Sequence, residues 1–458
     1  MTDTLLPGGR AYTYRISVVA AIGGLLFGFD TAIINGAIVF LRRQFSWSEV
    51  QTEIAASSLL VGCVIGASAA GALSDWLGRR RILLLSAAIF ALSSVATSLP
   101  NSLALFCAAR LVAGMAIGIA SLLCPLYIAE VSPAGIRGLL VSLNQLAIVT
   151  GILISYLVGW SLSSLGPASW RWMFASAALP SVLFYLALFT VPESPRWLTK
   201  ERRYGDALAL LTRLGERDAA LRLKEIKTAV EEESGSLAQL FQPGYRLPLI
   251  IGVTLAVFQQ ITGINTILYY GSIIFTEHVG TQSASAALWA NVIIGTMNLV
   301  CTIVSLFIID RLGRKALLMI ASGGMGISLA ILGMILLLYP SSGSPVLALI
   351  LCYVAFFSVG MGPTVWVVIS ELFPTRIRGR AMSIATISLW AACTLITLSF
   401  LSLVKAISVS GAFWCYAVMC VLTFLFVWRV TPETKGKTLE EIERNWGPSQ
   451  VAPPAVSD

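Results

Sequence analysis

Long, nearly continuous runs of apolar residues follow one another along the chain, with short polar connections between them. Each run is about 20 residues long, which is the length a helix needs to cross roughly 30 Å of hydrocarbon. The first run follows a polar leader and is too long for a cleavable signal peptide, so we expect it to remain as a helix. The pattern predicts twelve transmembrane helices, at residues 16–38, 52–73, 82–99, 103–126, 138–160, 171–191, 247–275, 286–309, 316–338, 346–371, 381–404 and 409–429.

The composition and the distribution of charge agree with a membrane protein. Of the 458 residues, 57% are hydrophobic and 12% are charged, whereas soluble domains carry about 25% charged residues. Basic residues gather at 79–81, 311–315 and 376–380, in connections on one side of the predicted bundle. Because positive residues mark the cytoplasmic side, we expect these connections and both termini to be cytoplasmic. The formal charge of +8 therefore indicates topology and not a nucleic-acid partner, since no long basic run exists.

Several classes of site are excluded by what the sequence lacks. All eight cysteines fall inside predicted helices, where they serve as small apolar residues, and His278 is the only histidine. We therefore expect no metal and no cofactor, and the sequence shows no nucleophile–base pair that would indicate an enzyme. The first outer connection is short and no Asn-x-Ser/Thr acceptor is present, which favours a multi-pass protein of a bacterial inner membrane.

Three short polar motifs occur twice, at nearly the same separation along the chain. The pairs are Asp75-Trp-Leu-Gly-Arg-Arg with Asp310-Arg-Leu-Gly-Arg-Lys, Glu130-Val-Ser-Pro with Glu371-Leu-Phe-Pro, and Pro192-Glu-Ser-Pro with Pro432-Glu-Thr-Lys. An even number of predicted helices separates the copies, so the two halves share one orientation, as in carriers that work by alternating access. We expect an N-terminal half at 1–192, cytoplasmic linker helices at 193–245, a C-terminal half at 246–432 and a cytoplasmic tail at 433–458.

With these motifs and the segment Gln259-Gln-Ile-Thr-Gly-Ile-Asn, the chain resembles the sugar porter family of the major facilitator superfamily. The resemblance extends over nearly the whole length. The chain resembles both the bacterial proton-coupled sugar symporters and the human glucose facilitators of this family. The resemblance implies an all-α membrane protein with the major facilitator fold, in which twelve transmembrane helices form two six-helix halves joined by a short cytoplasmic helical linker.

Asp30 is an acid inside the first apolar run, where a charge costs roughly 2.5 to 3.5 kcal/mol at the centre of a helix. Counting at 1.5 Å per residue places it about 12 Å below the outer surface, and Arg110 of the fourth run about 10 Å below the same surface. We expect the two to pair, either as a proton switch or as a permanent ion pair that only joins two helices. The resemblance favours the switch, because proton-coupled members carry this acid and arginine as the coupling pair. Ala177 stands where a related xylose symporter has a further acid.

Amide side chains mark a candidate sugar site. Neutral amides that donate and accept hydrogen bonds suit hydroxyl groups, an aromatic face suits the CH patches of a sugar, and Gly263 can interrupt the helix between the amides. Each amide alone is as well explained by contacts between helices. Family members bind sugar at the positions of Gln145, Gln259, Gln260, Asn265, Asn298 and Trp390. Ile152 replaces a glutamine of the xylose symporter, and glucose facilitators have isoleucine there.

Aromatic residues and a second interrupted run point to the pathway and its gates. Phe27 and Trp366 resemble aromatics that line the pathway in the family, and Tyr269 and Tyr270 resemble those that close its outer end. Simple packing is the alternative for each of them. The tenth run is interrupted by Gly360-Met-Gly-Pro, which a membrane helix tolerates mainly where it lines a cavity, so we expect a hinge there.

The repeated cytoplasmic motifs place acids beside basic residues just beyond helix ends. Anchoring at the cytoplasmic surface explains the basic residues but not the acids. We expect charge pairs among them to hold the cytoplasmic side shut while the outer side is open. The predicted gate network comprises Asp75, Arg79, Arg80, Glu130, Arg137, Glu193, Arg196, Asp310, Arg314, Lys315, Glu371, Arg378 and Glu433.

These features together predict a proton-coupled monosaccharide symporter, with a hexose such as glucose as substrate. Its expected partners are the sugar, the proton and the lipid bilayer. A passive facilitator is the nearest alternative, and a membrane sugar sensor that does not transport is a further one.

Overall fold

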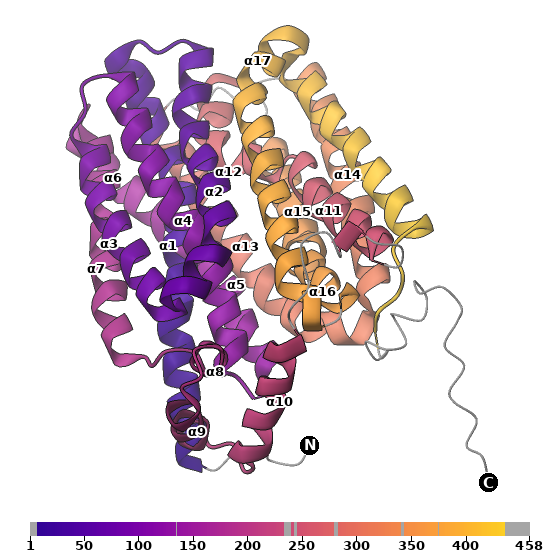
Figure 1. The fold of residues 1–458 in the computed structure, drawn as a ribbon. Coiled ribbons are helices and arrows are strands. Elements are labelled where there is room, and N and C mark those ends of the chain that lie inside the picture. The colour runs from indigo at the N-terminus through magenta and orange to yellow at the C-terminus, as the bar shows by residue number, and fades with distance from the viewer. Residues whose placement is uncertain are drawn as a thin grey trace.

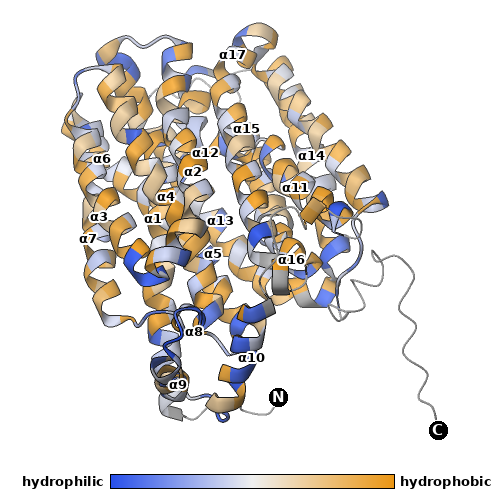
Figure 2. Cartoon of the chain, viewed as in Figure 1, coloured by the Kyte–Doolittle hydropathy of each residue, from blue (hydrophilic) through white to orange (hydrophobic). Residues whose placement is uncertain are grey.

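The computed structural model describes residues 7–133, 135–232, 240–241, 245–278, 283–339, 343–373 and 375–435. Within these ranges the regular elements are all helices, and they form two bundles that stand side by side (Figure 1). The helices are apolar along most of their length, whereas polar residues collect on the short helices at one end (Figure 2). Large apolar side chains face outward from the bundles, among them Leu92, Leu179 and Phe307, which are 74%, 69% and 68% exposed. An exposed apolar surface of this kind is suited to lipid.

The first bundle contains the N-terminal six crossings. Its sixth crossing is divided at Ala177 into two shorter helices, while the other five are continuous. The helices are α1 Pro7–Phe45, α2 Glu49–Leu77, α3 Arg79–Ser98, α4 Leu103–Val131, α5 Arg137–Leu162, α6 Ser169–Ser176 and α7 Ala178–Ala187, with short 3-10 turns η1 Ser163–Leu165 and η2 Leu188–Thr190. Ser48 and Ser102 accept hydrogen bonds from backbone N–H groups at the starts of α2 and α4, which explains why these helices begin there.

Three short helices follow the first bundle: α8 Pro195–Lys200, α9 Tyr204–Arg213 and α10 Ala219–Glu232. They lie at the end of the molecule where α1 begins (Figure 1). Thr13 of α1 donates a hydrogen bond to the Leu214 carbonyl at 3.3 Å, and the guanidinium of Arg213 lies 4.2 Å from the centre of the Tyr12 ring. The linker helices therefore pack on the start of α1, and we call this end of the molecule the linker end and the opposite end the outer end.

The second bundle contains the C-terminal crossings, two of which are interrupted. Its elements are α11 Arg246–Ile261, α12 Ile264–Ile273, η4 Ile274–His278, α13 Ala284–Leu312, α14 Arg314–Leu338, α15 Gly343–Phe356, η5 Phe357–Met361, α16 Gly362–Leu372 and α17 Thr375–Arg429. Gly263 separates α11 from α12 in a left-handed conformation (φ 96°), which glycine adopts at little cost. The tenth crossing passes through one π-helical turn, η5, directly before Gly362 and Pro363. Both interruptions occur where the sequence predicts them.

The last two predicted helices are joined into one continuous element. The described residues contain eleven long apolar helices, and the last of them, Gly379–Arg429, has 51 residues. Ser408 within it has φ 72° and ψ 163°, and the two arms of α17 run back beside each other from this turn (Figure 1). The element therefore crosses twice, which makes twelve crossings and confirms the predicted number. The turn is so short that helical hydrogen bonding continues almost to Ser408 on both sides.

The two bundles repeat one local device at the linker end. In the first, the carboxylate of Glu193 accepts hydrogen bonds from the backbone N–H groups of Arg79 and Arg80, at 2.9 and 3.1 Å, and so caps the start of α3. In the second, Glu433 accepts from Arg314 and Lys315 at 3.0 and 3.1 Å and caps the start of α14. An acid at a helix start is favoured by the unpaired N–H groups and the helix dipole.

Glycine is required at both caps. Gly78 and Gly313 precede the capped helices with φ 96° and φ 91°, a conformation that other residues rarely adopt. A Cβ at Gly78 would collide with Oε2 of Glu193, and one at Gly313 would lie 2.8 Å from Oε2 of Glu433. The glycines of the repeated motifs thus let the acid approach the helix start.

The pKa values of the two capping acids are shifted in opposite directions. Burial raises the pKa of Glu193 above the ordinary value of a glutamate and outweighs the lowering by the N–H donors of Ser194, Arg80 and Arg79. Burial also acts on Glu433, but the N–H donors of Lys435, Arg314, Lys315 and Thr434 outweigh it, so the pKa of Glu433 is lowered. Ionised Glu433 therefore stabilises the fold above its unfolded pKa, and this contribution is lost as the pH falls through the lowered value. The contribution of Glu193 has the opposite sign: it is present below its unfolded pKa and is lost as the pH rises through the raised value.

These pKa shifts predict that two matched substitutions lower the stability of the fold by different amounts. Near neutral pH, Glu433→Gln should lower the melting temperature more than Glu193→Gln, because only the first removes a charge that the fold favours. Thermal unfolding of the purified protein, followed by tryptophan fluorescence, measures the difference. A larger loss for Glu193→Gln would contradict the assigned directions.

Candidate functional site

Asp30 and Arg110 meet inside the first bundle, as the depth count predicts. Nη1 of Arg110 on α4 donates to both carboxylate oxygens of Asp30 on α1, at 2.8 and 2.7 Å. The two residues are 2% and 0% exposed, so the pair is shielded from solvent on all sides. A buried carboxylate with one guanidinium partner is satisfied only while the pair is intact, because removing either charge leaves the other uncompensated.

An aromatic ring of the first bundle lies against the pair. The guanidinium of Arg110 lies 5.2 Å from the centre of the Phe174 ring, which adds a cation–π contact. Ala177 of the sixth crossing is fully buried. Within the part of the chain that the structure describes, Nε and Nη2 of Arg110 have no hydrogen-bond partner. Arg110 thus depends on Asp30 for its charge compensation.

The amides of the seventh crossing hold the interrupted tenth crossing. Gln259 of α11 is 3% exposed, and its side-chain NH₂ donates to the carbonyls of Met361 and Gly362, at 3.1 and 2.9 Å. These carbonyls lie where the π-helical turn gives way to α16. Gln259 therefore ties the seventh crossing to the interrupted part of the tenth.

A second link joins the amides on either side of Gly263. Gln260 donates to Oε1 of Gln259 at 3.2 Å, and Asn265 donates to Oε1 of Gln260. Asn265 also contacts Sγ of Cys393 on α17 at 3.1 Å. The three amides thus form a continuous chain of hydrogen bonds around the break in the seventh crossing.

Asn298 contacts the same interrupted segment from α13. Its Oδ1 accepts a hydrogen bond from Oγ of Ser358 at 2.8 Å, and Ser358 lies in the π-helical turn η5. Asn298 and Gln259 therefore both bind residues of the segment from Ser358 to Gly362. Four of the predicted sugar-binding residues are brought to two adjoining helix breaks.

Trp390 connects this group to the first bundle. Its ring lies 5.1 Å from the ring of Phe27 on α1, and its Nε1–H donates to Oγ of Ser121 on α4 at 3.3 Å. Ile152 on α5 is 4% exposed, whereas Gln145 and Trp366 are only partly buried. The predicted sugar-binding residues therefore come from both bundles, and Trp390 and Phe27 touch where the bundles meet.

Polar contacts join the two bundles at the outer end. Asn35 of α1 donates to the Leu268 carbonyl at 3.0 Å and accepts from the Ser272 N–H at 2.7 Å, and Tyr156 donates to the same carbonyl at 3.2 Å. Further contacts on this end are Glu53 with Ser402, Arg42 with Glu277 at 2.7 Å, and Glu49 with Lys405 at 3.3 Å. At the outer end, the two bundles are thus joined by side chains that the sequence analysis did not identify.

The predicted gate tyrosines lie close to these contacts. Tyr269 and Tyr270 are fully buried in α12. The hydroxyl of Tyr270 donates to the Thr397 carbonyl at 2.7 Å, and its ring stacks on Phe400 of α17 at 5.4 Å. Both of these contacts lie within the second bundle, so the role of Tyr270 in the outer gate stays a prediction.

Charged residues of the predicted gate network contact one another at the linker end of the first bundle. Arg79 donates to both oxygens of Glu130, at 3.2 and 3.3 Å, and lies 3.0 Å from Asp75. Ser194 donates to Glu130, and the side chain of Arg80 donates to the Leu188 carbonyl at 3.0 Å. These contacts tie the starts of α3 and of the linker helix α8 to the end of α4.

The second bundle repeats the arrangement. Arg314 donates to Glu371 at 3.0 Å, and Thr434 donates to the other oxygen of Glu371 at 2.6 Å. Arg137 of the first bundle donates to the Ser132 carbonyl at 3.3 Å, and Arg196 lies in α8. The side chains of Asp310 and Arg378 lie outside the described residues. Since these charge pairs join elements of one bundle, the prediction that they shut the cytoplasmic side between the halves remains open.

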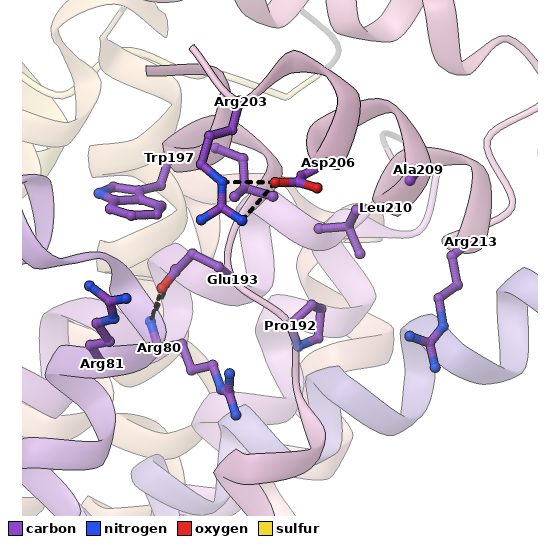
Figure 3. Close-up of a pocket in the computed structure, with 11 residues that line it drawn as sticks. Arg80, Arg81, Pro192, Glu193, Trp197, Arg203, Asp206, Ala209, Leu210 and Arg213 are labelled. Atoms are coloured by element: carbon purple, nitrogen blue, oxygen red, sulfur yellow. Dashed lines mark hydrogen bonds and ion pairs between the residues drawn. The ribbon is translucent and has the colours of Figure 1, made fainter. Parts of the chain in front are cut away.

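A cavity of about 400 Å³ lies between this network and the linker helices. Figure 3 shows Arg80 and Glu193 on one side of it and, on the other, Arg203 paired with Asp206 at the start of α9. Nε of Arg203 donates to Asp206 at 2.8 Å, while Glu193 accepts from the Arg80 backbone N–H. Charged groups of the first bundle and of the linker thus face the same cavity.

The sequence contains one signal for the contacts at the outer end: polar residues inside apolar runs. Asn35, Glu53 and Asn291 all lie in predicted transmembrane helices and are 0%, 1% and 1% exposed. Such residues usually face the bundle interior and pair with one another. Their partners include the backbone groups of Leu268, Ser272 and Ser402, which no residue pattern marks as available.

Comparison with known proteins bears on this architecture. The model of the sugar (and other) transporter family matches residues 16–446. The chain is 41% identical over 443 residues to the arabinose-proton symporter of Bacillus subtilis (strain 168), covering 95% of both chains. It is 38% identical over 477 residues to the D-xylose-proton symporter of Escherichia coli (strain K12), covering 96% of both.

A solved structure matches over the same length. The structure of the major facilitator superfamily proton:xylose symporter XylE bound to 6-bromo-6-deoxy-D-glucose superposes with a TM-score of 0.83 and 36% identity, covering 95% of this chain and 99% of that one. The family match, the curated relatives and the superposition all span both bundles. The chain therefore belongs to the sugar (and other) transporter family and has the fold of the major facilitator superfamily.

Proposed function

We propose that the protein is a proton-coupled monosaccharide symporter that works by alternating access. The observation that carries the coupling is the pair of Asp30 and Arg110, buried inside a chain of the sugar transporter family. Two curated relatives are named as proton symporters of sugars, which supports the same coupling here. We place the protein in a bacterial cytoplasmic membrane, with the linker end and both termini in the cytoplasm.

Asp30 is the proposed proton carrier. While it is ionised, both of its oxygens hold Nη1 of Arg110, and this fixes α1 against α4. A proton on Asp30 removes the charge that compensates Arg110 and weakens the hold between the two helices. The first bundle can then reorient with its sugar, and loss of the proton on the cytoplasmic side restores the pair. Since no second acid stands at Ala177, we assign the coupling to Asp30 alone.

The sugar is proposed to bind at the two helix breaks. The chain of amides from Gln259 to Asn265 can exchange its internal hydrogen bonds for sugar hydroxyl groups, and Trp390 with Phe27 offers a flat apolar face. Asn298 holds η5, so a sugar that engages it would act directly on the interrupted tenth crossing. We assign this segment as the hinge of the inner gate. Gln145 and Trp366 complete the proposed lining.

We propose a hexose as the preferred sugar. Ile152 is apolar and buried, so it cannot supply a hydrogen bond that a polar residue would give at this position. The related structure holds a deoxyglucose derivative, which supports a site of hexose size in this chain as well. Binding of labelled glucose, xylose and arabinose to the purified protein tests the order. A stronger binding of the pentoses would assign the preference to them.

Asp30→Asn tests the coupling. The amide cannot carry a proton, so uptake against a sugar gradient should fall to background, while exchange of labelled sugar across the membrane continues. Reconstituted vesicles with an imposed proton gradient measure both. Concentrative uptake by the variant equal to that of the wild type would disprove the coupling role. If a protonophore leaves wild-type uptake unchanged, the protein is a passive facilitator.

Gln260→Leu tests the sugar site. It keeps the size of the side chain but removes the amide between Gln259 and Asn265, so sugar affinity should fall about 10-fold to 100-fold. Equilibrium binding of labelled sugar gives the ratio to the wild type. The matched control is Gln44→Leu, because Gln44 lies at the outer end of α1 and contacts Trp170 at 2.7 Å. Equal losses in both variants would show a general effect on the fold and not a binding contact.

A further inference from the structure

Glu53 is a second buried acid, and it crosses the interface between the two bundles. It lies in the first turns of α2 and is 1% exposed. Its Oε1 accepts a hydrogen bond from the backbone N–H of Ser402 at 2.7 Å, and its Oε2 accepts one from Oγ of Ser402, also at 2.7 Å. Ser402 lies in α17, so one residue of the second bundle supplies both donors.

This geometry makes the contact depend on the closed outer end. A carboxylate removed from water needs strong donors, because burying it without them is costly. Both donors to Glu53 come from one residue of the opposite bundle, so separation at the outer end removes them together. Once the outer end opens, water can solvate the carboxylate. Glu53 is therefore satisfied in the closed state by Ser402 and in the open state by water.

Among the described residues, the hydrogen bonds to the Glu53 carboxylate come from Ser402. Glu49, one turn earlier on α2, pairs with Lys405 at 3.3 Å, and their side chains are 35% and 74% exposed. The exposed pair of Glu49 and Lys405 contributes little, because solvent screens it. The buried contact of Glu53 with Ser402 is the stronger link between α2 and α17.

We propose that Glu53 is a positioning residue for alternating access: with Ser402 it latches the outer end shut while the carrier faces the cytoplasm. The latch rests on the proposed function, since only an alternating carrier needs its outer end to open and close. It acts apart from the proposed proton carrier Asp30, because Glu53 joins the two bundles whereas Asp30 joins two helices of one bundle. Release of the latch precedes entry of sugar from outside.

Two substitutions should shift the equilibrium between the open and closed states of the outer end in opposite directions. Ser402→Ala removes one donor and leaves Oε2 of Glu53 buried without a partner in the closed state, so the ratio of open to closed should rise about tenfold. Glu53→Gln removes the charge but keeps an oxygen for the Ser402 N–H and an NH₂ for Oγ. Because a neutral amide is cheaper to bury than a carboxylate, this variant should favour the closed state.

Hydrogen–deuterium exchange of the full-length protein in lipid nanodiscs measures the shift. For Ser402→Ala, peptides covering 49–60 and 396–405 should exchange faster than in the wild type, and for Glu53→Gln they should exchange more slowly. The matched controls are Ser399→Ala, whose hydroxyl bonds to carbonyls of its own helix, and Glu49→Gln, which breaks the exposed pair. Both controls should match the wild type.

The latch is disproved if Ser402→Ala exchanges like Ser399→Ala, or if Ser402→Ala and Glu53→Gln shift in the same direction. The measurement needs neither sugar nor a proton gradient. A failure of symport in vesicles, with the opposite shifts present, would therefore overturn the proposed function and leave the latch in place. Normal symport without the shifts would overturn the latch alone.

Discussion

A polar group inside a membrane protein must find its partner within the protein, and this constraint governs how the two bundles are built. Asp30 and Arg110 satisfy each other across α1 and α4, at full burial. Gln259 donates to backbone carbonyls at the interruption of the tenth crossing. Each such group therefore either fixes a helix contact or marks a place where the backbone departs from regular helix. Binding and movement are proposed at these places because their partners can be exchanged.

The repeated motifs build equivalent polar contacts at the linker end of both bundles. Glu193 and Glu433 cap equivalent helices, and Glu130 and Glu371 hold the equivalent arginines, Arg79 and Arg314. Each bundle thus closes its own network, which allows it to move as a rigid body. The outer end is different, because Asn35, Glu53 and Tyr156 reach backbone groups of the other bundle. Rigid bundles with exchangeable contacts between them are what a rocking movement requires.

The agreement between sequence and structure was closest where a residue type carries a large energetic cost. Asp30 and Arg110 were paired correctly by depth, because each charge has few alternatives inside a helix bundle. Gly263 and the segment Gly360-Met-Gly-Pro were identified as interruptions, because these residues weaken a helix wherever they occur. The outer contacts were missed, since they pair an ordinary polar residue with the backbone of a distant helix.

By itself, the sequence determined the membrane class, the twelve crossings, the duplicated halves and the central charge pair. These follow from local composition and from spacing along the chain, which the energy of burial in lipid constrains directly. The tertiary structure decided that Glu53 meets Ser402, that Asn35 meets Leu268, and that Trp390 touches Phe27 and Ser121. It alone could decide these, because a hydrogen bond between helices depends on how far each has rotated and shifted, and packing of the whole bundle sets that geometry.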